Sequence, residues 1–293
     1  MRRRHFLWFD VVNVIILGLI SLVAIYPFWY ILIYSVSNPQ LAAKGIYLLP
    51  AGFTMKNFAV IFENPNIVNA TVISVLRTAV GTVTTVVASA LFAYCLANAK
   101  TPGRKIMYRM IFYSMYFNAG IIPWYLTLKT YGLKDNFLLY ILPYAVSPFY
   151  LILFKAYFEQ LPRELEESAF MDGAGFLRSF RSIILPVSLP IVATIALFSA
   201  VNQWNMWFDN FYLAQSKRLM TLQLLLLNYL TEYSANQSAV LANFDQTNRA
   251  GVRITPTSIR MAITTVAVLP VFCIYPFVQK YFVKGIMLGA IKG

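Results

Sequence analysis

The segment from Glu164 to Pro186 reads ELEESAFMDGAGFLRSFRSIILP, and it interrupts a chain that is otherwise strongly apolar. Its acidic residues come first, Gly173 follows, and Phe176, Phe180 and Ile184 then recur at every fourth position. Acidic side chains stabilise the N-terminus of a helix, and glycine commonly ends one. The pattern therefore predicts two short helices joined by a turn, partly charged and partly apolar.

The composition around this segment is that of a membrane protein. Hydrophobic residues make up 59% of the 293 residues, aromatic residues 16% and charged residues only 12%, whereas soluble domains carry about 25% charged residues. The net charge of +13 comes from cations that flank apolar runs. This placement favours a membrane orientation signal over nucleic-acid binding. Both cysteines fall inside apolar runs, so no disulfide is expected.

Six segments are apolar over the roughly 20 residues that a helix needs to cross a membrane. They are Val11 to Val36, Thr71 to Ala97, Ile106 to Leu128, Phe137 to Tyr157, Ile183 to Phe208, and Ile259 to Phe282. The alternation typical of barrel strands is absent. We therefore expect an all-α polytopic fold with six transmembrane helices in a single transmembrane domain, residues 1–293. The apolar run after the basic leader (Met1 to His5) is too long for the apolar part of a signal peptide, so we expect it to remain as the first span.

The distribution of Lys and Arg predicts the orientation of these spans. One set of connecting segments holds thirteen cations: Arg2, Arg3, Arg4, Lys100, Arg104, Lys105, Lys155, Arg163, Arg178, Arg181, Lys280, Lys284 and Lys292. The other set holds eight: Lys44, Lys56, Lys129, Lys134, Lys217, Arg218, Arg249 and Arg253. By the positive-inside rule, both termini and the segment between the fourth and fifth spans are cytoplasmic. Residues 209–258 would then form an extracytoplasmic loop.

Motifs of the common catalytic sites are missing from the chain. It has no G-x-x-x-x-G-K-[ST] phosphate loop, no H-E-x-x-H and no G-x-S-x-G, and its one histidine, His5, lies in the basic leader. We therefore expect no enzyme activity, no metal site and no cofactor in this chain. The segment from Glu164 to Pro186 could serve as a docking knob or as an amphipathic connector resting on the membrane surface.

The same segment carries a recognisable spacing: Glu167-Ser168-Ala169, two residues, Asp172-Gly173-Ala174, and a closing Ile183-Ile184-Leu185-Pro186. This spacing resembles the EAA loop of ATP-binding-cassette (ABC) importer permeases, in which alanine is more usual than Ser168. The resemblance implies that residues 159–186 form a cytoplasmic loop whose coupling helix docks in a cleft of an ATPase subunit. The residues it assigns to this coupling are Glu167, Ser168, Ala169, Asp172, Gly173, Ala174, Leu185 and Pro186, with Glu167 making polar contacts and Gly173 allowing the turn.

Three further stretches resemble one branch of that family. The tail QKYFVKGIMLGAIKG (Gln279 to Gly293) is similar to the second permease subunit of maltose-type carbohydrate importers. FNAGIIPWYL (Phe117 to Leu126) and NQWNMWFDNFYL (Asn202 to Leu213) are similar to a sub-branch that takes oligosaccharides released from polysaccharides, alginate and other uronates among them.

The resemblance also implies partners in the cytoplasmic membrane. These are a second, homologous permease subunit, two cytoplasmic ATPase subunits that hold ATP and Mg, and an extracytoplasmic sugar-binding protein. The oligosaccharide itself and membrane lipid complete the set, with no nucleic acid. A permease for a non-sugar solute, such as a peptide or a lipid, shares the EAA loop and remains an alternative. An ion-driven secondary transporter is a more distant one, because it needs acidic residues within its spans.

Candidates for a sugar path cluster at the end of the fifth span: Asn202, Gln203, Trp204, Asn205, Trp207 and Asp209. Indole faces stack on sugar rings and amides bind hydroxyl groups, although an interfacial aromatic belt would give the same composition. Arg77, inside the second span, could attract an anionic sugar or could extend to the interface. The second span also carries a small residue at every fourth position from Gly81 to Ala97, which predicts close helix packing, most simply within the chain.

Overall fold

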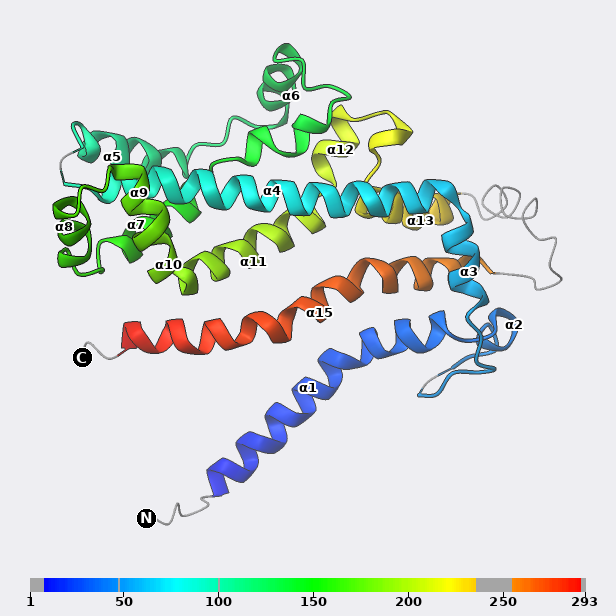
Figure 1. Ribbon diagram of the computed structural model, residues 1–293. Helices are drawn as coiled ribbons and strands as arrows, with labels where there is room; N and C mark the ends of the chain where they lie inside the picture. The colour runs from blue at the N-terminus through cyan, green and yellow to red at the C-terminus, as the bar shows by residue number, and fades with distance from the viewer. Residues whose placement is uncertain (1–7, 47, 100, 236–254, 291–293) are drawn as a thin grey trace. The chain divides into compact units, whose positions relative to one another are not determined.

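The computed structural model describes residues 8–46, 48–99, 101–235 and 255–290. This part of the chain is helical, and its only strand-like feature is an isolated bridge between Ser37 and Phe53 (Figure 1). The chain divides into two compact units. Unit 1 comprises Met1–Val68 and Leu226–Leu269, and unit 2 comprises Asn69–Leu225 and Pro270–Gly293.

Unit 1 is built on α1 (Trp8–Ser35), with α2 (Pro39–Ala42), α3 (Lys56–Glu63) and the first part of α15 (Pro256–Ala290). Its small core lies at the end of α1, where Ile33 and Tyr34 pack with Ala42 and Ile46. The buried Asn57 side chain donates to the Ser35 and Ser37 carbonyl oxygens at 2.8 and 2.9 Å, which fixes the chain as it leaves α1. The preceding length of α1 exposes apolar side chains, a surface suited to lipid.

Unit 2 contains most of α4 (Pro65–Ala97), a helix of 33 residues that is about 50 Å long at 1.5 Å per residue. The elements that follow are α5 (Arg104–Ser114), α6 (Ile121–Thr130), η1 (Phe137–Tyr140), η2 (Leu142–Tyr144), α7 (Pro148–Phe158), α8 (Glu164–Met171), α9 (Phe176–Ser179), η3 (Phe180–Ile184), α10 (Leu185–Val187), α11 (Leu189–Asn205), α12 (Phe208–Leu213) and η4 (Lys217–Leu219). Helix α13 (Leu222–Ala235) begins in unit 2, but most of it belongs to unit 1. Ala90, Leu151, Phe154 and Ile195 are fully buried where α4, α7 and α11 pack together.

The small residues along α4 face this intrachain packing. The Thr85 hydroxyl donates to the Tyr144 carbonyl oxygen at 2.8 Å, and the Ser89 hydroxyl accepts from the Ser147 backbone N–H at 3.4 Å. Gly81 is so close to Gln203 that a Cβ there would lie 2.6 Å from its amide nitrogen. The stripe therefore brings α11 and the start of α7 close to α4, as the simplest interpretation of the sequence predicted.

Within the described residues, three helices are long and apolar enough to cross a membrane: α1, α4 and the Thr257–Ile274 part of α15. Two bent pairs raise the number to five if each pair is one span. One joins Phe137–Tyr144 to Pro148–Phe158 with a bend of 46°, and the other joins Phe176–Val187 to Leu189–Asn205 with a bend of 85°. Several apolar helices of this length are what a polytopic membrane protein contains.

Two of the expected spans have a different form in the structure. Ile106 to Leu128 is not one helix, because α5 ends at Ser114 and α6 begins after Gly120, whose φ is 84°. The 11 residues of α5 extend only about 16 Å, half the apolar thickness of a bilayer. The fifth expected span does not run straight from Ile183, since the chain turns by 85° before α11. Pro186 and Pro190 flank that turn and lack the N–H that a continuous helix needs.

Candidate functional site

The segment from Glu164 to Val187, called the coupling segment here after the role that the EAA resemblance implies, folds into short helices joined by a turn as its sequence predicted. Helix α8 ends at Met171, and Gly173 follows with φ 77°, a left-handed conformation that favours glycine. The Gly173 and Ala174 backbone N–H groups donate to the Phe170 and Ala169 carbonyl oxygens at 3.1 and 2.9 Å, which closes the end of α8. Helix α9, the π-helical turn η3 and α10 then lead into α11.

The two faces of the coupling segment differ in burial. Ala169, Phe180 and Ile184 are buried in the described structure, and Ala174 and Leu185 are half-buried. The opposite face exposes the remaining residues that the EAA resemblance singled out: Glu167, Ser168, Asp172, Gly173 and Pro186. It also exposes two large apolar side chains, Met171 at 88% and Leu177 at 65%. An exposed surface that combines acids with large apolar groups is typical of a binding site for another protein.

The sequence did not indicate how the coupling segment is attached to the rest of unit 2. The Tyr94 hydroxyl at the end of α4 donates to the Glu166 carboxylate at 2.5 Å. A pocket of about 350 Å³ lies beside this contact and is lined by the end of α4, the end of α7 and α8. Neither Tyr94 nor Glu166 was among the candidate residues. The available signal was the four-residue spacing of Ala90 and Tyr94 on α4 and of Asn98, which follows the end of that helix.

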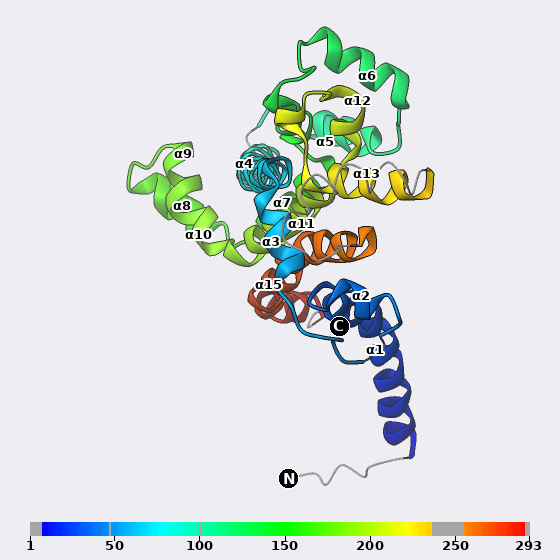
Figure 2. The same ribbon diagram turned by 90° about the vertical axis from the view of Figure 1, so that its right-hand side faces the viewer.

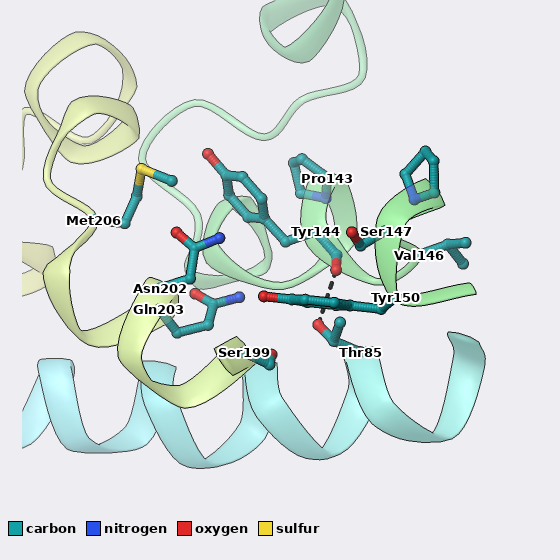
Figure 3. Close-up of a pocket in the computed structure, with 11 residues that line it drawn as sticks. Thr85, Pro143, Tyr144, Val146, Ser147, Tyr150, Ser199, Asn202, Gln203 and Met206 are labelled. Carbon is teal, nitrogen blue, oxygen red and sulfur yellow. Dashed lines mark hydrogen bonds between the residues drawn. The ribbon is translucent and has the colours of Figure 1, made fainter. Parts of the chain in front are cut away.

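A second pocket, of about 210 Å³, lies where α4, η2, α7 and α11 meet (Figure 3). Figure 3 shows Thr85 reaching it from α4, the Tyr150 ring crossing it, and the Asn202 and Gln203 amides on its α11 side. The described residues that line it are Thr85, Pro143, Tyr144, Val146, Ser147, Pro148, Tyr150, Ser199, Asn202, Gln203 and Met206. Their polar groups are hydroxyls and amides without formal charge.

A buried ion pair joins α4 to α12 close to this pocket. The Arg77 guanidinium donates to both Asp209 carboxylate oxygens at 3.0 and 2.6 Å, and the two side chains are only 1% and 0% exposed. Arg77 also donates to the Gln203 amide oxygen at 3.0 Å and to the Met206 carbonyl oxygen at 3.1 Å. Its guanidinium carbon lies 4.5 Å from the centroid of the Tyr140 ring.

The sequence left two interpretations of Arg77 open, and this network excludes one of them. Arg77 does not extend to an interface, because it is buried and its charge is matched by Asp209. Gln203 is held from both sides, since its amide nitrogen also donates to the Tyr140 carbonyl oxygen at 3.2 Å. Of the candidate path residues, Gln203 belongs to both the network and the pocket.

The other candidates are more dispersed. Asn202 is exposed and lines the pocket, whereas Trp204, Asn205 and Trp207 are not among its described lining residues. Trp204 is buried, and Trp207 packs edge-on against Phe208 and Phe211. The polar loop from Thr231 to Ser258 lies mostly outside the described residues, as do His5 and the three arginines of the leader.

Two proteins of known sequence are similar to this chain over nearly its whole length. It is 36% identical to Protein LplC of Bacillus subtilis (strain 168), over 97% of this chain and 95% of that protein. It is 33% identical to the polygalacturonan/rhamnogalacturonan transport system permease protein YtcP of the same organism, over 97% of this chain and 98% of that protein.

A solved structure shares the fold at nearly full length. It belongs to a bacterial ABC transporter involved in the import of the acidic polysaccharide alginate, and it matches with a TM-score of 0.87 and 29% identity over 96% of this chain and 99% of that one. No protein-family model matches the chain. The fold, the exposed EAA-like segment and these full-length similarities show that the chain belongs to the family of permease subunits of ABC importers for carbohydrates and oligosaccharides.

Proposed function

We propose that this chain works as one of two different permease subunits in the cytoplasmic membrane, together with two cytoplasmic ATPase subunits that bind ATP and Mg. An extracytoplasmic binding protein delivers the oligosaccharide, and residues 209–258 face that side. The proposed topology has six spans and both termini in the cytoplasm. The transport functions of the relatives support the oligosaccharide, and the distribution of Lys and Arg supports the orientation.

The observation that carries this proposal is the exposed face of the coupling segment. Glu167 is exposed beside Met171 and Leu177, so that one surface offers a negative charge and two large apolar contacts. A cleft in an ATPase subunit would bury all three. Closure of the ATPase pair can move the permease only if it binds one permease conformation better than the other. Reversing a 1:99 population takes about 5.5 kcal/mol of such differential binding.

The pocket on α11 supports a role for this chain as one wall of the sugar path. Its volume of about 210 Å³ is below the roughly 300–1,000 Å³ of ordinary ligand pockets, so an oligosaccharide needs a further wall from the second permease subunit. The uncharged hydroxyl and amide groups of the lining suit sugar hydroxyls. Because Asp209 already matches the charge of Arg77, this arginine does not recognise an acidic sugar in the described conformation.

We propose an acidic oligosaccharide as substrate, because YtcP is a polygalacturonan/rhamnogalacturonan transport permease and the solved structure is that of an importer of the acidic polysaccharide alginate. Recognition of its carboxylates then belongs to the binding protein or to the second permease. Uptake by proteoliposomes should be fastest for oligogalacturonate or oligoalginate and much slower for neutral malto-oligosaccharides of equal length. Faster uptake of the neutral series would contradict this choice of substrate.

The coupling role is tested by substitution on the exposed face. Glu167→Lys reverses the charge offered to the ATPase, and Gly173→Pro forces a φ near −65° on a residue that has φ 77°. We expect either variant to assemble as a folded chain by size-exclusion chromatography and to lose at least about tenfold of ATP-driven uptake. For Glu167→Lys the reason is that a hydrogen bond to a charged group contributes about 1.5–3 kcal/mol, and for Gly173→Pro it is that the turn after α8 can no longer form. Ser168→Ala, which introduces the residue more usual in the family, is the matched control and should keep full uptake. Normal uptake by Glu167→Lys or Gly173→Pro would refute the coupling role.

A further inference from the structure

Tyr94 of α4 contacts three elements of the coupling segment: α8, α9 and η3. Its hydroxyl donates to Glu166 of α8 at 2.5 Å and lies 3.5 Å from the Ser179 hydroxyl of α9. Its ring stacks on Phe176 with centroids 4.4 Å apart and on Phe180 with centroids 5.2 Å apart. One side chain thus combines a short hydrogen bond to a carboxylate with two aromatic contacts, and it is only 3% exposed.

Glu166 and Glu167 are neighbours on α8 that differ in exposure and in contacts. Glu167 is exposed and free to face a partner, whereas Glu166 is half-buried, accepts from Tyr94 and lies 3.4 Å from the Asn98 amide nitrogen. Hydrogen bonds between a hydroxyl and a carboxylate at this length are about twice as strong as neutral ones. Glu166 therefore attaches α8 to the permease, and Glu167 stays exposed for the partner of the proposed function.

The other end of this connection is the pocket. Helix α4 carries Tyr94 at its cytoplasmic end in the proposed topology, and it carries Thr85 in the pocket lining nine residues earlier, a distance of about 13 Å along one helix. Figure 1 shows α8 and α9 at the C-terminal end of α4, and Figure 2, which looks along α4, shows α8, α9 and α10 on one side of it. A displacement of α8 that keeps the Tyr94 contact must therefore displace the helix that lines the pocket.

We propose that the Tyr94–Glu166 hydrogen bond, supported by the stack of Tyr94 on Phe176 and Phe180, is the joint that passes movement of the coupling segment to α4. Tyr94 and Glu166 are positioning residues for transport, and this inference rests on the proposed coupling function. Without the joint, the ATPases still dock on the Glu167 face and still hydrolyse ATP, but α4 follows their movement poorly. The signature is a loss of sugar transported per ATP hydrolysed, with assembly unchanged.

The experiment uses the complete importer with its binding protein, reconstituted in proteoliposomes, and measures uptake and ATP hydrolysis together. Tyr94→Phe keeps the aromatic stack and removes only the hydroxyl, and Glu166→Ala removes the acceptor. We expect each variant to lower uptake per ATP about tenfold, the effect of losing a hydrogen bond to a charged group. The double variant should lose no more than either single one, because both remove the same contact. Glu166→Gln keeps an acceptor oxygen but loses the charge that strengthens the hydrogen bond, so its uptake per ATP should lie between those of the original chain and Glu166→Ala.

Tyr157→Phe is the matched control. Tyr157 packs against the same apolar cluster on α7 but makes no hydrogen bond to the coupling segment within the described residues, so its uptake per ATP should not change. The proposal would be refuted if Tyr94→Phe left the uptake per ATP unchanged. It would also be refuted if the loss in the double variant were the product of the two single losses. Failure of the underlying coupling function has a different result, since Glu167→Lys would then keep full uptake whatever Tyr94→Phe does.

Discussion

The ion pair of Arg77 with Asp209 and the ion pair of Lys155 with Glu159 have nearly the same length but different surroundings. Their closest nitrogen–oxygen distances are 2.6 and 2.7 Å. The first pair is 1% and 0% exposed, whereas the second is 15% and 42% exposed and lies within one turn of α7. Arg77 has further partners in Gln203, the Met206 carbonyl and the Tyr140 ring, and Lys155 lies 4.4 Å from the Tyr108 ring centroid.

Because the two distances are nearly equal, we expect burial, and not distance, to decide how much each pair stabilises the protein. A buried charge that loses its partner cannot recover the interaction from water, so either half of the buried pair depends on the other. An exposed charge is hydrated with or without its partner, and the pair contributes little. We therefore expect the junction of α4 with α12 to be fixed and the end of α7, beside the coupling segment, to tolerate change.

Asp209→Ala should give the largest loss of stability. It leaves Arg77 buried without a matching charge, and breaking a buried pair in this way costs about 3–5 kcal/mol. The free energy of unfolding, measured by denaturant titration of the purified chain in detergent, should fall by this amount. The replacement of both partners, Arg77→Met with Asp209→Leu, is the matched control and should recover most of the loss, because no unpaired charge remains.

If Asp209→Ala lowered the free energy of unfolding by less than about 1 kcal/mol, the range of exposed pairs, the buried pair would not stabilise the chain more than an exposed one. The same conclusion would follow if the double replacement were as unstable as Asp209→Ala alone, since the loss would then come from packing rather than charge.

Gly81→Ala tests the close packing that holds Gln203 against Arg77. The new Cβ would lie 2.6 Å from the Gln203 amide nitrogen and 2.7 Å from its amide carbon, so this side chain must shift away from Arg77. Overpacking of this kind costs about 1–3 kcal/mol. We expect a fall in the free energy of unfolding within that range and slower uptake, because Gln203 also lines the pocket.

Gly18→Ala on α1 is the matched control for this substitution. Nothing lies within 4 Å of a Cβ at Gly18, and alanine favours a helix over glycine by up to about 1 kcal/mol. The control should be neutral or slightly stabilising. Equal destabilisation of both variants would mean that contact with Gln203 is not the cause.

Structure that is determined by residues close together in the chain, such as the long helices and the turn at Gly173, could be predicted from the sequence. Long apolar runs predicted α1 to within three residues at each end and the end of α4 at Ala97, although α4 begins at Pro65 and not at the expected Thr71. Gly173 marks the end of α8 in both the sequence and the structure. The break between α5 and α6 also had local signals, since Asn118, Gly120 and Pro123 fall inside the expected third span. The apolar character of the segment as a whole outweighed these signals and led to the prediction of one continuous span.

The site contacts depend on residues far apart in the chain, and local patterns do not contain them. Arg77 and Asp209 are separated by 132 positions, and Tyr94 and Glu166 by 72. Arg77 and Asp209 were both assigned to a sugar path because a charge or amide near a span suggests a function. Only the packing of α4 against α12 shows that these two charges match each other.

Glu159→Ala should give the smallest effect and completes the comparison of the two ion pairs. It removes the partner of Lys155, but Lys155 keeps its contact with the Tyr108 ring and access to water. We expect the free energy of unfolding to change by no more than about 0.5 kcal/mol, as for other pairs four residues apart on a helix. The measurement is the same titration used for Asp209→Ala, repeated at high salt, where the small effect should shrink further because exposed charges are screened. A loss comparable with that of Asp209→Ala would mean that burial does not separate the two pairs, and that the end of α7 is as fixed as the junction of α4 with α12.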